Sequence, residues 1–162
     1  MTSAYVVCGS RDWPKNGLWL VTAKMIELIP SGSLIITGGA RGVDEHAHRE
    51  AIRLGYPTKV MRADWERYGK RAGYIRNIAM LDEQPVAVVA FCAGFSRGTM
   101  HTIRETTKRE ICLHWVKDED LRHPELAALD TDYEPIDLGG HSSLRRPSGA
   151  LRELRSQTRS GR

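Results

Sequence analysis

Three glycine-containing loops, each directly after a short apolar run, carry the residue types best suited to binding an anion. They span residues 9–13, 38–44 and 93–99. Glycine lets a phosphate approach the backbone, and N–H groups at the start of a helix attract negative charge. Arg11, Arg41 and Arg97 add one guanidinium per loop, and each can bind phosphate or carboxylate through two hydrogen bonds. The loops predict a site for a phosphate-bearing ligand, although a single such loop can also be only a tight strand-to-helix turn. The candidate contacts are Gly9, Ser10, Arg11, Trp13, Gly38, Gly39, Arg41, Gly42, Gly94, Ser96, Gly98 and Thr99.

A predicted helix over residues 69–81 carries a second polar feature. Gly73, Arg76, Asn77 and Met80 follow i, i+3, i+4, i+7 spacing and therefore share one helix face. Burying an arginine and an asparagine among apolar neighbours is costly unless both have partners. Arg76 and Asn77 either point into the ligand site or hold a neighbouring loop through a salt bridge or a cap. Both interpretations stay open at this stage.

Carboxylates and tryptophans near the loops extend the candidate site. Asp44 and Asp64 are candidates for an acid or a base, but Asp44 lies in the first turn of a predicted helix, where a carboxylate also stabilises the helix dipole. Trp13 and Trp65 each follow an aspartate just after a predicted strand. They could stack on a base or ribose, or simply cover the edge of the sheet.

Other reactive residue types do not form a convincing site. His46 and His48 are two residues apart, so they do not share a helix face, and no Cys-x-x-Cys pair is present. Cys8, Cys92 and Cys112 lie far apart in apolar runs, which favours reduced, buried thiols. The sequence predicts neither a metal site nor a cofactor.

Short apolar runs alternate with helical patterns over residues 4–116 and predict how these groups are positioned. Strands are expected at 4–8, 34–36, 58–61, 86–91 and 111–116, and helices at 18–29, 43–54, 69–81 and 99–109. The fourth run is entirely apolar, as in a parallel strand that is covered on both faces. The expected fold is α/β, a doubly wound, Rossmann-like three-layer sheet with strand order 3-2-1-4-5. The ligand crevice then lies at the carboxyl ends of strands one and four.

The size and charge of the chain restrict the function classes. Its 162 residues suit one domain, and 41% apolar with 27% charged residues is typical of a soluble globular protein. No apolar run is long enough to span a membrane and the start does not resemble a signal peptide, so we expect a cytoplasmic protein. The net charge is +4, but residues 139–162 alone carry six arginines and one acid. Residues 1–138 have 18 basic and 19 acidic groups, which argues against a domain that is basic throughout.

The expected organisation is a ligand-binding domain over residues 1–117, followed by a short helical or irregular extension over 118–138. The arginine-rich tail, 139–162, is expected to be disordered.

Motifs at residues 9–13, 38–44, 63–65, 68–73 and 76–77 occur together and in this order. Their combination resembles the YspA-like branch of the SLOG superfamily, which also includes the lonely-guy phosphoribohydrolases and the DNA-processing protein DprA. The resemblance covers about residues 4–116. It implies a Rossmann-like SLOG fold with a pocket for nucleotides or nucleotide derivatives, as in small bacterial and phage members of this branch.

The chain departs from the lonely-guy enzymes at two positions that matter for catalysis. Arg76 matches their helical arginine, but Asn77 stands where they have lysine. Residues 94–99 resemble their phosphate loop with one more residue between the glycines, and Thr102 stands at the position of their catalytic glutamate. A threonine cannot stabilise an oxocarbenium-like state or act as a base as a carboxylate does. Asp44 or Asp64 would have to replace it.

The leading expectation is therefore a protein that binds a nucleotide or nucleotide-derived ligand, either as an N-glycosidase-like hydrolase or as a sensor or sponge. Phosphate would lie on the 38–42 and 94–99 loops, with Trp13 or Trp65 on the base. The alternative is a nucleic-acid-binding protein that uses the tail and a DprA-like domain. The resemblance to dimeric lonely-guy enzymes implies a homo-oligomer, and no membrane partner is expected.

Overall fold

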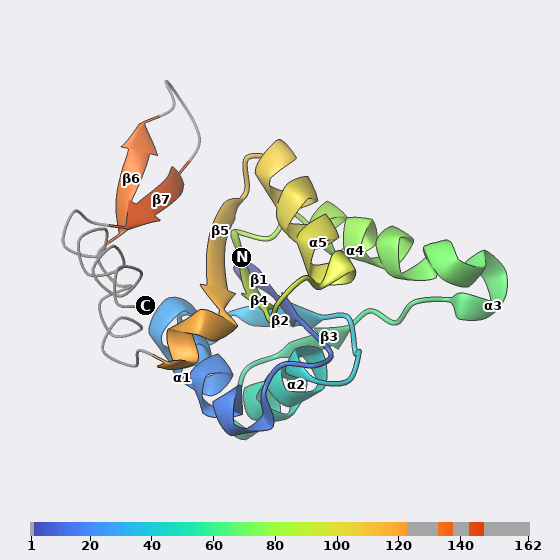
Figure 1. The fold of residues 1–162 in the computed structure, drawn as a ribbon, viewed down its shortest axis with the longest axis horizontal. Coiled ribbons are helices and arrows are strands. Elements are labelled where there is room, and N and C mark those ends of the chain that lie inside the picture. Colours follow the sequence, from blue (N-terminus) through green and yellow to red (C-terminus); the bar gives the residue numbers. More distant parts are fainter. Residues whose placement is uncertain (1, 123–132, 138–142, 148–162) are drawn as a thin grey trace, which may run out of the picture.

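The computed structural model describes residues 2–122, 133–137 and 143–147 and contains a five-stranded parallel sheet (Figure 1). The strand order is β3-β2-β1-β4-β5, which confirms the predicted order. The strands are β1 (Ala4–Gly9), β2 (Leu34–Thr37), β3 (Thr58–Val60), β4 (Ala87–Cys92) and β5 (Cys112–Lys117). The longer helices are α1 (Leu18–Leu28), α2 (Val43–Arg53), α4 (Ala72–Asp82) and α5 (Arg97–Lys108).

Helices cover both faces of the sheet and make three layers (Figure 1). Because successive strand residues point to opposite faces, β1 and β4 contribute to two separate cores. Val7 and Phe91 pack with residues of α1 and α2, whereas Val6 and Ala90 pack with residues of α4 and α5. Every residue of β4 is buried, which explains its uninterrupted apolar sequence.

The helix predicted over 69–81 is a 3-10 turn followed by an α-helix, and a further single helical turn precedes it. A single turn, α3 (Trp65–Tyr68), is followed by the 3-10 turn η2 (Gly69–Arg71) and then by α4. Gly69 has a φ of +50°, a left-handed conformation that glycine adopts easily and that interrupts the helix. Asp64 caps α3 by accepting a hydrogen bond from the Arg67 N–H at 3.0 Å.

Of two further 3-10 turns, η1 (Lys15–Gly17) lies between β1 and α1, and η3 (Asp118–Arg122) follows β5. Beyond it, β6 (Tyr133–Asp137) pairs with β7 (Ser143–Pro147) in an antiparallel ribbon. Of the predicted extension, only η3 and β6 are described. The tail predicted to be disordered lies outside the described residues except for β7. In the described part of the chain, no helix is long and apolar enough to cross a membrane.

The register of β1 against β4 brings the first and third glycine loops together. Gly9 lies opposite Phe91, and the Ser10 N–H donates to the Phe91 carbonyl at 2.9 Å. Immediately beyond, the Ala93 N–H donates to the Ser10 hydroxyl oxygen at 2.9 Å. These two bonds fix both loops at the switch point, where the strand order reverses and α/β sheets bind ligands.

Candidate functional site

A pocket of about 420 Å³ opens at this switch point, within the range of small-molecule sites. Its walls come from the loop after β1, the loop after β4, the start of α5 and one side of α3 and α4. The structure brings ten of the predicted site residues to this pocket: Gly9, Ser10, Arg11, Asp44, Trp65, Arg76, Asn77, Ser96, Gly98 and Thr99.

A buried ion pair forms the floor of the pocket. Asp44, only 3% exposed, accepts hydrogen bonds from the Gly9 and Gly38 N–H groups, both at 3.1 Å, and lies 3.7 Å from the Arg76 guanidinium. Burial raises the pKa of Asp44, while Arg76 and the N–H donors act in the opposite direction. The carboxylate thus holds β1, β2 and α4 together.

Asn77 continues this network to the mouth of the pocket. Its side-chain oxygen accepts a hydrogen bond from the Arg76 Nε–H at 3.0 Å, and its amide donates to the Gly98 carbonyl at 3.2 Å. The structural interpretation of the Arg-Asn pair is confirmed, because the two side chains join α4 to α2 and α5, and both also line the pocket.

The first turn of α5 faces the pocket without a side-chain cap. Ser96 occupies the N-cap position but makes no capping hydrogen bond; its hydroxyl instead lies 2.9 Å from the Thr99 hydroxyl. Ser96, Gly98 and Thr99 all line the pocket. An uncapped helix start is a suitable place for an anion.

Aromatic side chains and cations form the rim. Trp65, Tyr74 and Phe95 line the pocket and are exposed, with Phe95 78% exposed. The Arg11 guanidinium lies 5.9 Å from the centre of the Trp65 ring. Such exposed rings next to cations can stack on a nucleobase.

Several predicted contacts do not reach this pocket. Trp13 is 3% exposed, packs edge-on against Phe91 and donates its indole N–H to the Gly17 carbonyl, so it is a core residue and not a stacking surface. Asp64 is exposed and caps α3, and it does not line the pocket.

The loop after β2 is also placed differently from the expectation. The Arg76 guanidinium packs directly on Gly38, where a Cβ would overlap it, and Gly39 packs against Val60. Of this loop, Ala40 lines the main pocket, whereas Arg41 and Gly42 face a neighbouring basin. Gly94 adopts a φ of +52° in its loop and does not line the pocket.

Sequence analysis did not identify Lys70, Tyr74 and Phe95 as site residues. The position of Phe95 between Gly94 and Ser96 in an anion-type loop was an available signal, because an apolar ring there has no obvious core to enter. Lys70 and Tyr74 gave no such signal, since their place depends on how α3 and α4 turn over the pocket.

Reactive groups in the pocket are poorly suited to hydrolysis. Only two carboxylates line it, and Asp44 is occupied by its three partners. The other, Asp12, has a side chain that is 90% exposed and lies 3.7 Å from Arg41. Burial raises the pKa of the Cys8 thiol far above its usual range, so the thiol stays protonated at neutral pH. Within the described ranges, no group of three or more His, Cys, Asp or Glu side chains is arranged to hold a metal ion.

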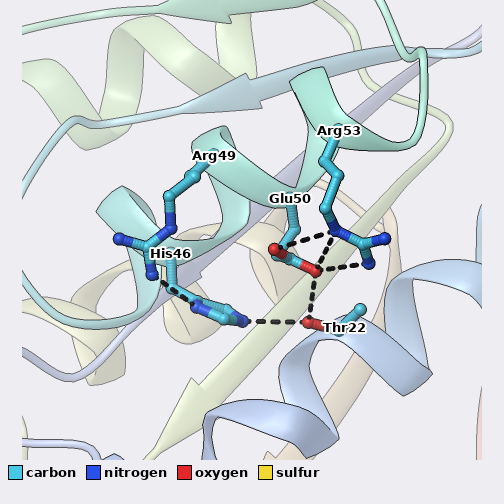
Figure 2. A network of polar contacts seen from close by, with 5 residues as sticks. All are labelled: Thr22, His46, Arg49, Glu50 and Arg53. Carbon is cyan, nitrogen blue, oxygen red and sulfur yellow. Dashed lines mark hydrogen bonds and ion pairs between the residues drawn. The ribbon is translucent and has the colours of Figure 1, made fainter.

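A second polar network joins α1 to α2, and two of its residues, His46 and Arg49, line the neighbouring basin (Figure 2). Arg49 can only donate, so the Nδ1 of His46 accepts its hydrogen bond at 3.1 Å and the Nε2–H faces the Thr22 hydroxyl at 2.9 Å. Thr22 in turn donates to Glu50 at 3.1 Å, and Arg53 pairs with Glu50 at 2.7 Å. The network requires His46 to be neutral.

Acidification is expected to destabilise the fold between pH 7.5 and 5.5. Burial lowers the pKa of both His46 and His101 from the ordinary 6.5. The unfolded chain then binds more protons than the folded chain just below pH 6.5, so the free energy of unfolding falls as the pH falls. Urea denaturation at the two pH values measures the loss. We expect a smaller loss in the His46→Gln/His101→Gln double variant, and an unchanged loss there would contradict this assignment.

Comparison with known proteins supports this architecture. The chain is 37% identical over 112 residues to the Gene 61 protein of Mycobacterium phage D29, and the match covers 65% of this chain and 90% of the phage protein. The chain belongs to the family of this phage gene 61 protein. Residues 1–66 of this family member also match the family model described as DNA recombination-mediator protein A, which places this segment among DprA-like domains of the SLOG type.

Two solved structures resemble this gene 61 family member. The Moco Carrier Protein of Chlamydomonas rheinhardtii superposes with a TM-score of 0.56 at 14% identity, covering 98% of this chain and 99% of that chain, and supports the Rossmann-like fold. DNA processing protein A (DprA) of Streptococcus pneumoniae gives a TM-score of 0.47 at 17% identity, covering 75% of this chain. The match covers 62% of that protein, so this chain spans less than two-thirds of its length.

Proposed function

We propose that the pocket binds a nucleotide or nucleotide-derived ligand and does not cleave it. The uncapped start of α5, beside exposed aromatic rings and cations, carries this proposal. Phosphate lies against the first turn of α5, and Arg97 and Lys70 add charge. The base stacks on the rim formed by Trp65, Tyr74 and Phe95.

A binding role fits the chemistry better than hydrolysis. The position of the lonely-guy glutamate is Thr102, whose hydroxyl donates to the Gly98 carbonyl at 3.3 Å. Asp44 holds the fold together and Asp64 lies outside the pocket. On the sequence motifs we also assign the chain to the YspA-like branch, as a cytoplasmic sensor or sponge for a nucleotide signal. The same relationship favours a dimer or higher homo-oligomer, which light scattering can measure.

Matched tryptophan variants test the stacking role of the rim. Trp65 and Trp19 are 50% and 51% exposed, but only Trp65 lines the pocket. Calorimetric titration with the four nucleoside monophosphates, their nucleosides and inorganic phosphate identifies the preferred ligand. We expect Trp65→Ala to weaken binding of that ligand about 5- to 150-fold, because stacking on a base contributes about 1–3 kcal/mol.

Trp19→Ala is the control and is expected to bind as the wild type does. Equal affinity of the two variants would contradict the stacking role, and absence of binding across the ligand set would contradict the proposal. Product analysis after prolonged incubation is a separate readout. Release of free base or phosphate would show that the hydrolase interpretation is right instead.

Nucleic-acid binding is the second candidate function, favoured by the match of residues 1–66 to the DNA recombination-mediator family model. Residues 139–162 carry six arginines and could add nonspecific attraction to phosphates. Deleting this tail tests the idea through DNA affinity measured against salt. Binding that is weak, steeply salt-dependent and lost on deletion would place it in the tail, and unchanged affinity would contradict a role for the tail.

A further inference from the structure

A second basin adjoins the ligand pocket across the turn that follows β1. It has a volume of about 780 Å³ and lies between this turn, the start of α1 and α2. Arg11 and Asp12 line both the pocket and the basin, so these two residues form a wall that the two hollows share. Lys15, Arg41 and Arg49 add positive charge to the basin, against Glu45.

A third, smaller hollow continues the same edge of the sheet and adds Arg62. Together the three hollows are lined by eight basic and three acidic residues, whereas residues 2–122 as a whole have 18 basic and 14 acidic residues. The other residues of this segment, ten basic and eleven acidic, nearly balance each other, so the excess of positive charge is concentrated where the strands end. Such a distribution directs anions to this edge.

Most of these cations are not engaged by carboxylates. Across residues 2–122, no ion pair involves Arg11, Lys15, Arg49, Arg62, Lys70 or Arg97. Away from the hollows, Arg53, Lys59, Lys108 and Arg109 form ion pairs of 2.6–2.7 Å, whereas no ion pair within residues 2–122 involves Arg67, Arg71, Arg104 or Lys117. The edge thus keeps positive charge that the fold itself does not neutralise.

Two details suit the basin to phosphate and not to a base. Trp13 lines it but is buried, so no exposed ring is available for stacking there. The Arg49 guanidinium is held at the basin by a hydrogen bond to the unprotonated Nδ1 of His46 (Figure 2). Because this partner is uncharged, it does not neutralise the charge of Arg49. Arg41 has only a 3.7 Å contact with Asp12, and both side chains are largely exposed, so a phosphate can replace that carboxylate.

We propose that the ligand extends across the Arg11–Asp12 turn as a phosphodiester-linked chain, with one nucleotide in the pocket and the next phosphate in the basin against Arg41 and Arg49. This inference rests on the proposed function and deepens it, because it names the ligand class. The shared chemistry is that of linked nucleotides, whether a free linear dinucleotide or the end of a single strand.

Titration with ligands of increasing length tests the proposal on the full chain. The probes are thymidine monophosphate, the linear 5′-phosphorylated dinucleotide of thymidine, and a thymidine decamer, each measured at two salt concentrations. We expect at least a tenfold gain in affinity from the monophosphate to the dinucleotide. A further gain with the decamer would identify a strand end as the ligand, and no further gain would identify a free dinucleotide.

Charge-matched double variants locate the second phosphate. Arg41→Ala/Arg49→Ala is expected to remove the gain from the added nucleotide while leaving monophosphate affinity within about twofold. The control, Arg104→Ala/Lys108→Ala, removes the same charge from α5 away from the hollows and should keep the gain. The arginine-rich segment is identical in all variants, so its contribution cancels.

Asp12→Asn is an independent test, because this substitution is expected to strengthen dinucleotide binding whereas the arginine substitutions weaken it. Removing this carboxylate from the shared wall should strengthen dinucleotide binding about two- to fivefold. Equal affinity of the wild type for monophosphate and dinucleotide would overturn the inference and leave the proposed function standing. An equal loss of both ligands in the Arg41→Ala/Arg49→Ala variant would also overturn it. Failure of the monophosphate itself to bind would overturn the proposed function as well.

Discussion

Asp44→Asn is expected to lower the free energy of unfolding by about 3 kcal/mol. Removing one partner of a buried ion pair typically costs about 3–5 kcal/mol, because the other charge stays buried without compensation. Here the Arg76 guanidinium, held 3.7 Å from Asp44, would lose its counter-charge. An amide would also place an N–H₂ group against one of the two backbone N–H donors, Gly9 or Gly38.

Urea denaturation of Asp44→Asn beside Asp12→Asn measures this effect. The Asp12 side chain is 90% exposed and lies 3.7 Å from Arg41, so its substitution should change the free energy of unfolding by no more than about 0.5 kcal/mol. A wild-type stability for Asp44→Asn would show that the carboxylate is not structural. Asp44 would then return as a candidate acid or base.

Gly9→Ala is expected to destabilise the fold by about 3 kcal/mol. A Cβ at this position would lie 2.6 Å from the Phe91 carbonyl oxygen and 2.7 Å from the Val43 Cβ. Neither neighbour can move freely, since Phe91 belongs to the fully buried strand β4 and Val43 is fully buried at the start of α2. Overpacking costs about 1–3 kcal/mol, and separating β1 from β4 would also weaken the Ser10–Phe91 hydrogen bond.

Gly98→Ala is the matched control for Gly9→Ala. It lies in the first turn of α5, and a Cβ there would meet no atom within 4 Å. Its stability should equal or slightly exceed that of the wild type, because alanine restricts the unfolded chain more than glycine does. Thermal unfolding of both variants checks this contrast, and similar melting temperatures would show that β1 tolerates a side chain at Gly9.

Much of the architecture could be read from local sequence patterns. The apolar run at 86–91 predicted a strand buried on both faces, and β4 is fully buried. The glycine loops at 9–13 and 93–99 were expected to meet at the reversal of strand order, and the Ser10–Ala93 hydrogen bond places them side by side. These features follow from periodicity, turn residues and the handedness of crossovers, which depend on near neighbours in the chain.

The residues that line the site could be predicted less completely from the sequence. Trp13 and Trp65 have the same local context, an aspartate before a tryptophan after a strand, yet one is a core residue and the other lines the pocket. The difference arises because α1 and Phe91 enclose Trp13, whereas Trp65 starts the exposed turn α3. No short-range pattern carries that information.

Sequence patterns were therefore sufficient for the order of elements, the strand order and the edge of the sheet where the pocket lies. Long-range packing was needed to show that Asp44 pairs with Arg76 across 32 positions and that Gly38 makes room for that guanidinium. It was also needed to show that the excess positive charge of residues 2–122 lies at one edge of the sheet. The physical reason is that strand and helix patterns are encoded locally. Charge pairing, burial and shared walls depend on distances between residues that only folding brings together.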